Sequence, residues 1–236
     1  MVEEPPETAI KTVRLAPAER RQRIVDAVVR VVSEHGIPEA TTSRIAEAAG
    51  VGPGTLYRYF GSREEMLRAA LDSVYEQIMR PWHEASELDP LERIREVGRR
   101  HSRIMASEEG GFAVPWVQFI AGASEVGLRD AVAETQRRAY QVVLQVFEEA
   151  KAQGSIRADA DTFELTYQFL VYAWGENICV LMGLSEFLGG QRSMKILEHF
   201  LDQAAAGSPA NGRGQQAGSS LRSGVDTKTV ELGGRT

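Results

Sequence analysis

The sequence lacks the features of most secreted and membrane-spanning proteins. It has one cysteine, Cys179, in 236 residues, so no disulfide can form within the chain, as expected in a reducing compartment. Its most apolar stretch, residues 169–184, contains Glu176 and Asn177 and is too short to span a bilayer. The acidic, proline-bearing start at residues 3–6 is unlike a signal peptide. We therefore expect a cytoplasmic protein with no membrane association.

The sequence also lacks the motifs of the common enzyme and metal-site classes. Its four histidines are widely separated, and no HExxH motif or cysteine pair could hold zinc. It contains no P-loop, no dinucleotide fingerprint and no Gly-x-Ser-x-Gly elbow. We therefore predict that the protein is not an enzyme and needs no metal or cofactor. A helical enzyme with a dispersed site is the remote alternative.

Basic residues are outnumbered overall but gather near the amino terminus. The formal net charge is −6, which by itself argues against a nucleic-acid partner. Residues 11–63, however, hold nine Lys and Arg against five Asp and Glu, a net charge of +4, which leaves −10 for the remainder. A basic end on an acidic body is typical of a nucleic-acid-binding module. Taken alone, such a run is more often a solvated surface.

Helical periodicity extends over most of the chain, and no useful stretch alternates with the period of a strand. Capping residues, glycines and prolines mark the ends of about nine helices. The expected helices cover about residues 17–36, 42–50, 53–60, 62–79, 89–107, 115–123, 128–153, 161–183 and 191–206. The fourth helix should stop before Pro81, because proline cannot continue the hydrogen-bond pattern. The predicted fold class is all-α.

Two short helices joined by a tight turn occupy the stretch TTSRIAEAAGVGPGTLYRYF, residues 41–60. Thr42 is a good N-cap for the first, and Gly50 can adopt the left-handed conformation that ends it. Gly52 and Pro53 begin the second, glycine as N-cap and proline at the first helical position. The residues expected to face inward are Ile45, Ala46, Ala49, Leu56 and Phe60. This pattern predicts a helix-turn-helix.

The run IA..AGV..GTLY.YF, followed by Ser62, Arg63 and the segment EEML, resembles the TetR family of bacterial one-component transcriptional regulators. The resemblance covers roughly residues 20–71, about a fifth of the chain. Two positions depart from the family pattern. Gly52 stands where the family usually has serine, and Arg63 stands where it usually has lysine, which keeps the charge but changes its geometry. Both departures could alter the preferred DNA sequence.

The resemblance implies two helical domains and a regulator that works as a homodimer on double-stranded DNA. We expect a disordered arm (1–16), a helix-turn-helix DNA-binding domain (17–63), a helical ligand-binding and dimerisation domain (64–206) and a disordered tail (207–236). The family commonly represses transcription from a palindromic operator and is released by a small-molecule effector, here expected to be apolar or aromatic. An activator, or a regulator that uses a protein partner instead of a small ligand, is the alternative.

The candidate DNA-binding residues surround the second helix of the motif. Small residues at its start permit close approach to the duplex, hydroxyls can bind phosphates, and Arg58 and Arg44 are candidates to read guanine. Arg63, in the first turn of the next helix, is a candidate phosphate ligand. The predicted set is Thr42, Arg44, Gly52, Pro53, Gly54, Thr55, Tyr57, Arg58, Tyr59 and Arg63. Core packing is the alternative for the tyrosines. Lys11 and Arg14 could reach a minor groove, although a flexible tail is the simpler reading.

The candidate effector-binding residues are aromatic and apolar, with a few polar groups, as in most ligand pockets. They are His101, Met105, Phe112, Trp116, Phe119, Tyr140, Phe147, Tyr172, Glu176 and Asn177. An ordinary core explains them equally well. Glu176 either lies at the pocket wall, paired with a ligand or an arginine, or faces water.

Dimerisation is expected because one recognition helix reads too few bases. The resemblance implies that the last two helices of each protomer pair into a four-helix bundle. The residues proposed for that interface are Phe169, Leu181, Leu184, Phe187, Leu188, Met194, Leu197 and Leu201.

Overall fold

The computed structural model describes residues 16–107, 111–188 and 192–207. Within these ranges the chain forms nine α-helices and two short 3-10 helices, with no strand beyond one isolated bridge between Ile156 and Ala205. The α-helices are α1 (Pro17–Glu39), α2 (Thr42–Ala49), α3 (Pro53–Tyr59), α4 (Arg63–Glu84), α5 (Pro90–Met105), α6 (Ala113–Gly122), α7 (Arg129–Ala152), α8 (Thr162–Leu181) and α9 (Arg192–Ala204); the 3-10 helices are η1 (Ala123–Val126) and η2 (Ser185–Phe187). The predicted all-α class is confirmed. Almost all of the predicted arm, with Lys11 and Arg14, and of the predicted tail lies outside the described residues.

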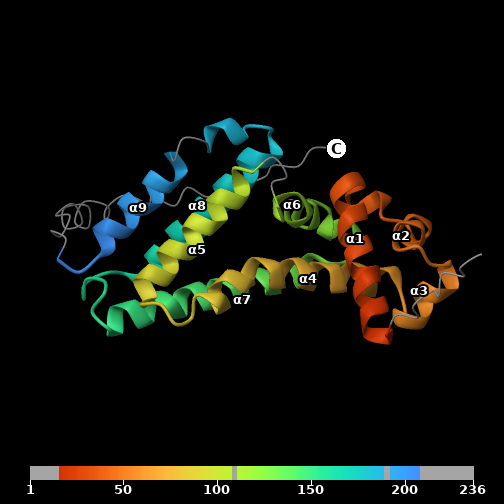
Figure 1. Ribbon diagram of the computed structural model, residues 1–236, viewed down its shortest axis with the longest axis horizontal. Helices are drawn as coiled ribbons and strands as arrows, with labels where there is room; N and C mark the ends of the chain where they lie inside the picture. The colour runs from red at the N-terminus through yellow and green to blue at the C-terminus, as the bar shows by residue number, and fades with distance from the viewer. Residues whose placement is uncertain (1–15, 108–110, 189–191, 208–236) are drawn as a thin grey trace, which may run out of the picture.

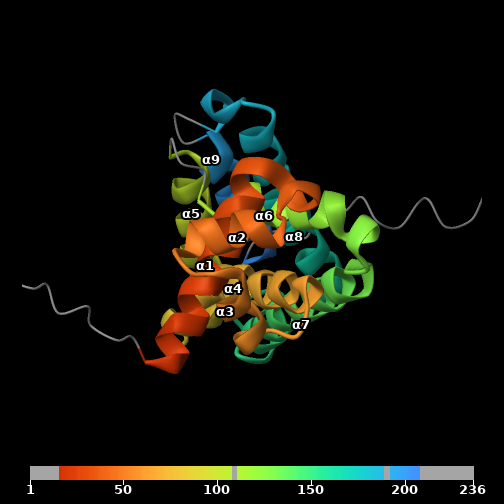
Figure 2. The same cartoon turned by 90° about the vertical axis from the view of Figure 1, so that its right-hand side faces the viewer.

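The described helices form an elongated molecule with a small head at one end. The head consists of α1, α2 and α3, and the body consists of α4 to α9 (Figure 1). Helices α4 and α7 run alongside each other from the head into the body, and α5, α8 and α9 pack together at the other end. Viewed from the head, α1, α2 and α3 lie in front of the body (Figure 2). Helix α6 packs against both α1 and α8, so it connects head and body.

Two large apolar clusters stabilise this arrangement. The first joins the head helices to the amino-terminal half of α4, to α6 and to the start of α7. The second lies in the body and joins the carboxy-terminal half of α4 to α5, α7, α8 and α9. Because α4 contributes to both clusters, it links the head mechanically to the body. None of the described helices combines the length and apolar character needed to cross a membrane.

The ends of the head helices follow the sequence signals, with one correction. The N-cap of α2 is Thr41, whose hydroxyl accepts a hydrogen bond from the Arg44 backbone nitrogen at 3.4 Å, so the prediction that Thr42 caps this helix was wrong by one residue. Gly50 ends α2 with φ of 65°, in the left-handed region where glycine meets no Cβ strain. Gly52 and Pro53 begin α3 as predicted.

Helix boundaries differ from the prediction most clearly at Pro81. Helix α4 continues through Pro81 to Glu84, so the predicted stop near Met79 was wrong. A proline costs the helix one backbone hydrogen bond, but Pro81 and Trp82 are buried in the body, and their packing offsets that loss. Helix α1 shows the opposite case. Its backbone leaves the helical region at Gly36, with φ of 76°, so the regular helix ends where predicted and one further turn follows.

Candidate nucleic-acid interface and effector cavity

The face of the head formed by α3 leaves small and polar residues exposed. Leu56 is buried on the inner side of α3, and Phe60 is buried directly after it. On the outer side the first turn, Gly52 to Gly54, is exposed, and no atom lies within 4 Å of a Cβ built on either glycine. Tyr57 and Arg58 are exposed, whereas Thr55 and Tyr59 are half-buried. The backbone of the first turn is therefore open to close approach by a large partner.

The two predicted guanine-reading arginines have different surroundings. Arg44 is exposed on α2, but its Nη1 lies 2.7 Å from a carboxylate oxygen of Glu39, so it already has an acidic partner. Arg58 is exposed on α3 and has no partner among the described residues. The hydroxyls of Thr42 and Tyr57 lie 3.4 Å apart and connect α2 to α3. Arg58 is thus the less encumbered of the two guanidinium groups.

Arg63 binds backbone carbonyls of the head. It is the first residue of α4, and its Nε donates to the carbonyl of Ala40 at 2.7 Å. One of its terminal nitrogens donates to the carbonyl of Ile37. These carbonyls belong to the last turn of α1 and to its connection with α2. The predicted phosphate contact would require this guanidinium to leave or share its present partners, so Arg63 also serves to fasten α4 to the head.

A second arginine stabilises the end of α2. Arg30, on α1, donates to the carbonyl of Ala48 at 2.6 Å. Carbonyls in the last turn of a helix lack partners within it, and a cation near that end also interacts favourably with the helix dipole. The position of the helix-turn-helix on α1 is therefore fixed by polar contacts as well as by the apolar core.

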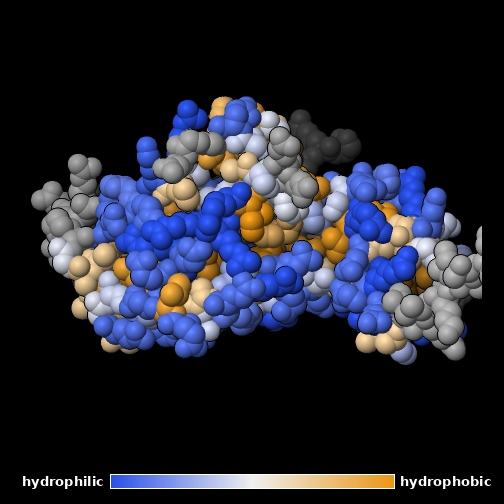
Figure 3. All heavy atoms as spheres, viewed as in Figure 1, coloured by the Kyte–Doolittle hydropathy of each residue, from blue (hydrophilic) through white to orange (hydrophobic). Residues whose placement is uncertain are grey.

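The body contains a cavity between α4, α5, α6, α7 and α8. Its volume is about 70 Å³, well below the roughly 300–1,000 Å³ of sites that hold drug-sized ligands. The described residues that line it are Tyr75, Ile78, Met79, Pro81, Trp82, Val97, Gly98, His101, Ile104, Phe112, Trp116, Gln136, Ala139, Val143, Phe169, Leu170, Tyr172, Ala173, Trp174 and Asn177. On the face drawn in Figure 3, hydrophobic residues gather in a recess near α4, α5 and α6, bordered by hydrophilic ones. A ligand of ordinary size would have to displace side chains or helices to enter.

Half of the predicted effector-binding residues line this cavity. Those that do are His101, Phe112, Trp116, Tyr172 and Asn177. Met105, Phe119 and Phe147 are fully buried in the apolar clusters instead. The Tyr140 hydroxyl donates to the Phe163 carbonyl at 3.3 Å, beside α8. For these four residues the alternative of ordinary packing describes what is observed. Glu176 lies behind the wall.

Sequence reasoning missed the contribution of α4 to the cavity. Tyr75, Met79 and Trp82 recur at helical spacing on one side of α4 and line the cavity. Trp82 lies beyond the predicted end of the helix, so the sequence gave no reason to place it on the same face. Trp174, on α8, was also missed. The spacing of aromatic residues along α4 was the available signal.

Glu176 lies in a buried polar cluster that connects α5, α8 and α9. Its side chain is 3% exposed, and its Oε1 accepts hydrogen bonds from the hydroxyls of Ser102, at 2.9 Å, and Ser193. Nε2 of His101 lies 3.5 Å from Oε2. Glu176 thus pairs with hydroxyls and a histidine, and both predicted options, an arginine partner or a water-facing position, were wrong for this protein without a ligand. Its partners come from two other helices, far away in the sequence.

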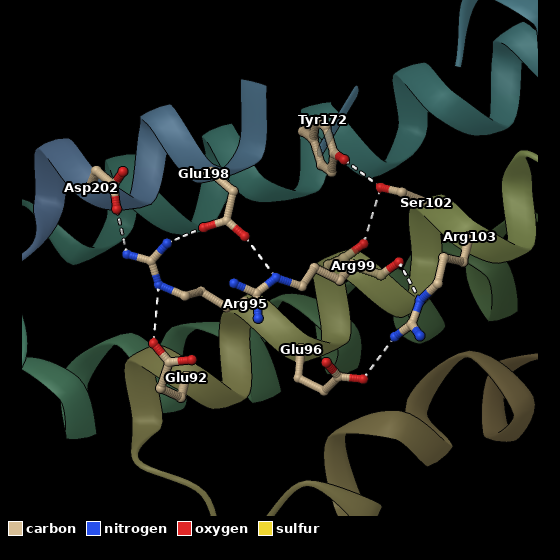
Figure 4. Close-up of polar contacts among 10 residues, drawn as sticks. Glu92, Arg95, Glu96, Arg99, Ser102, Arg103, Tyr172, Glu198 and Asp202 are labelled. Carbon is tan, nitrogen blue, oxygen red and sulfur yellow. Dashed lines mark hydrogen bonds and ion pairs between the residues drawn. The ribbon is translucent and has the colours of Figure 1, made fainter. Parts of the chain in front are cut away.

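Burial controls the ionisation of the groups beside Glu176. Desolvation lowers the pKa of His101 more than the nearby carboxylate raises it, so the imidazole is neutral at pH 7. Burial raises the pKa of Tyr172 to about 12. The Tyr172 hydroxyl contacts Ser102, as Figure 4 shows, and also accepts from Ser193. The polar end of the cavity is therefore ordered by a network of neutral groups around one carboxylate.

An ionic cluster fixes α9 on α5 (Figure 4). Arg95 contacts Asp202 at 2.7 Å and also contacts Glu198, and Arg99 contacts the other oxygen of Glu198 at 2.7 Å. Arg95 is largely buried, and a guanidinium that binds two carboxylates in this way is geometrically specific. The cluster thereby sets the position of α9 beside α8.

The outer face of α8 carries an exposed apolar stripe. Its members recur every three or four residues, and each is at least 36% exposed: Phe163, Tyr167, Val171, Trp174, Ile178 and Leu181. Of the residues predicted for a dimer interface, Phe169, Leu188, Leu197 and Leu201 are buried within the protomer, so that part of the prediction was wrong. Helix α8 is apolar on nearly every side, and its sequence alone could not show which side remains open.

Comparison with known proteins gives matches over the head and over the whole fold. Residues 24–70 match a family described as "Bacterial regulatory proteins, tetR family". The HTH-type transcriptional repressor KstR of Rhodococcus jostii is 37% identical over 90 residues, which is 38% of this chain and 42% of that protein. The chain thus spans about two fifths of the length of this curated relative.

Solved structures resemble the whole chain more closely than the sequences do. A TetR family transcription regulator from Marinobacter aquaeolei superposes with a TM-score of 0.60 at 23% identity and covers 80% of this chain and 97% of that one. The transcriptional regulator FadR from Bacillus subtilis, solved in complex with stearoyl-CoA, has a TM-score of 0.58 at 19% identity over 80% of this chain and 99% of that one. At these identities the likeness establishes the fold.

Proposed function

Because this chain belongs to the TetR family of bacterial regulatory proteins, we propose that it is a transcriptional repressor that binds a palindromic operator as a homodimer. A small molecule that binds in the body's cavity releases it from DNA. In this proposal residues 17–63 form the DNA-binding domain and residues 64–206 form the ligand-binding and dimerisation domain. The observation that carries the proposal is the exposed face of α3, with an open first turn and an unpaired arginine on a helix-turn-helix.

The DNA contacts are assigned from exposure and chemistry. The first turn of α3 enters the major groove, where Gly52, Pro53 and Gly54 allow the backbone to approach the duplex. Arg58 reads a guanine edge, and Arg44 does so only if it leaves Glu39. The hydroxyls of Thr42, Thr55, Tyr57 and Tyr59, together with Arg63, are assigned to phosphates, which position the head without reading sequence.

The homodimer is assigned to the apolar stripe of α8. A second copy of the chain covers Tyr167, Val171, Trp174 and Ile178 by presenting the same stripe, as a two-fold interface requires. Ile196, which is 64% exposed on the neighbouring α9, extends this surface. Two heads related by a two-fold axis match two half-sites of a palindrome.

The link between ligand and DNA is assigned to α4 and α6, which line the cavity and also reach the head. Tyr75 and Trp82 on α4 and Trp116 on α6 contact the cavity. Helix α6 packs closely on α1, since a Cβ on Gly122 would lie 2.9 Å from the Cβ of Ile37. A ligand larger than the present cavity displaces these helices and shifts the population toward a head spacing that no longer fits the operator.

Selection from random DNA duplexes tests the DNA part of this proposal. Purified full-length protein is mixed with a random library at two salt concentrations, and the bound duplexes are sequenced. We expect a palindromic consensus whose affinity falls steeply with salt, because phosphate contacts release counterions. Weak binding without a consensus at both salt concentrations would contradict the proposal.

A further inference from the structure

The polar end of the cavity presents hydrogen-bond acceptors that lack donors. Oδ1 of Asn177 and Oε2 of Glu176 are buried, and neither has a hydrogen-bond partner among the described residues. The two side chains are 4% and 3% exposed. Asn177 lines the cavity, and Glu176 lies directly behind His101, which also lines it. Unpaired buried acceptors are costly in a folded protein, so a ligand that brings donors is stabilised here.

The imidazole of His101 adds a further acceptor. Its Nε2 lies 3.3 Å from the carbonyl oxygen of Ala173 and 3.5 Å from the carboxylate of Glu176. Both neighbours can only accept, so Nε2 carries the proton. Because burial keeps the ring neutral, Nδ1 is left as an unprotonated acceptor. Nδ1 has no hydrogen-bond partner among the residues that the structure describes.

The charge around this end of the cavity favours a cation over an anion. None of the described residues that line the cavity is a lysine or an arginine. The carboxylate of Glu176 is the nearest formal charge, and no arginine or lysine among the described residues pairs with it. Phe112, Trp116 and Trp174 contribute aromatic rings to the wall, and such rings attract cations through their faces.

Building on the function proposed above, we propose that the effector is an organic amine, protonated at neutral pH, on an apolar or aromatic frame. Its ammonium group donates to Asn177 Oδ1 and to His101 Nδ1, and the charge of Glu176 behind the ring stabilises it. Its frame lies among the aromatic residues of α4 and α6. A carboxylate or phosphate ligand at this end would face Glu176 with no basic residue to neutralise it.

Three matched probes test the ligand class by calorimetry on the full-length protein at pH 7.5: 4-phenylbutylamine, 4-phenylbutan-1-ol and 4-phenylbutyrate. They differ in the group at the end of the same frame. We expect the amine to bind about tenfold more tightly than the alcohol, because charge-assisted hydrogen bonds are stronger than neutral ones. The carboxylate should bind most weakly.

Variants then assign the preference to residues. Glu176→Gln keeps the shape and should remove most of the preference for the amine, while Glu164→Gln, an exposed carboxylate on the same helix, should leave it unchanged. Asn177→Leu should weaken binding of both amine and alcohol. The comparison of probes on the unmodified protein needs no variant, so it remains decisive if Glu176→Gln does not fold.

Equal binding of amine and alcohol, tighter binding of the carboxylate, binding of none of the probes, or an unchanged preference in folded Glu176→Gln would each overturn the assignment. Operator binding is measured separately on the same preparations. A protein that binds its operator but shows no preference for the amine retains the proposed function and loses the ligand class. A protein that prefers the amine but selects no operator retains the ligand class and loses the proposed function.

Discussion

The head and the body have different kinds of core. Every buried residue of α1, α2 and α3 is apolar or glycine. The body buries polar side chains on α5, α7, α8 and α9, among them Ser102, Thr135, Thr166, Glu176 and Asn177. It also encloses the cavity. An apolar core without voids favours one arrangement, whereas buried polar groups beside a cavity can be re-paired by a ligand. The difference suits a head that presents a constant surface and a body that responds.

The largest expected effect concerns the apolar core of the head. Leu56→Ala removes a side chain that is fully buried between α2, α3 and α1. We expect the free energy of unfolding to fall by about 2–5 kcal/mol, from lost burial and the resulting cavity. Urea unfolding measures this change. Tyr57→Ala, one residue away but 52% exposed, should cost far less, and equal losses in the two variants would show that the head core is not packed as described.

Arg63 tests whether polar contacts also fix the head. Arg63→Ala leaves the carbonyls of Ile37 and Ala40 without their donor, and hydrogen bonds from a charged group contribute about 1.5–3 kcal/mol. We expect a loss of stability in that range and only partial recovery with Arg63→Lys, which lacks the forked geometry. Urea unfolding measures it. Unchanged stability, together with a salt slope of DNA binding reduced by about one unit, would instead assign Arg63 to a phosphate.

Arg58 tests whether the constant surface reads sequence. Arg58→Ala should lose about 1–3 kcal/mol of discrimination at one base position of each half-site. Stability should not change, because the side chain is exposed. Repeating the selection from random duplexes measures the change. Arg137→Ala, which removes an exposed arginine of the body, serves as the control. A consensus identical to that of the unmodified protein would contradict the role of Arg58.

The smallest expected effect is the response of the body to pH. Burial lowers the pKa of His101 in the folded state, so the unfolded chain binds a proton that the folded protein excludes. The stability from this neutral histidine is present above its unfolded pKa, roughly 6.5, and is lost as the pH falls below it. The slope contributed is at most about 1.4 kcal/mol per pH unit. Urea unfolding between pH 7.5 and pH 5 measures it, and His101→Gln should reduce the slope; an unchanged slope would assign it to other groups.

The head was predictable from sequence because its turns depend on backbone chemistry. Gly50, Gly52 and Pro53 restrict where two helices can end and begin, so the helix-turn-helix and its inner face followed from their order. The error at the α2 cap, Thr41 instead of Thr42, arose because adjacent threonines offer the same hydroxyl. The all-α class and the helix order followed from periodicity and caps in the same way.

The cavity was less predictable because lining and core residues are chemically alike. Trp116 lines the cavity while Phe119, three residues later on α6, is core. Glu176 was recognisable as unusual, but its partners Ser102 and Ser193 approach from α5 and α9, and no local pattern records that meeting. The open face of α8 was hidden for a related reason, since Phe169 and Trp174 belong to the same apolar helix and differ only in what covers them.

The most direct test of the central claim, that two heads read one operator, compares the selected palindrome with a duplex that carries one half-site. Both duplexes have equal length, and binding is measured by fluorescence anisotropy. Simultaneous binding of two linked heads should make the palindrome at least about a hundredfold tighter, and Trp174→Asp, which places a charge in the α8 stripe, should abolish most of that gain. Equal affinity for the two duplexes in the unmodified protein would contradict the account.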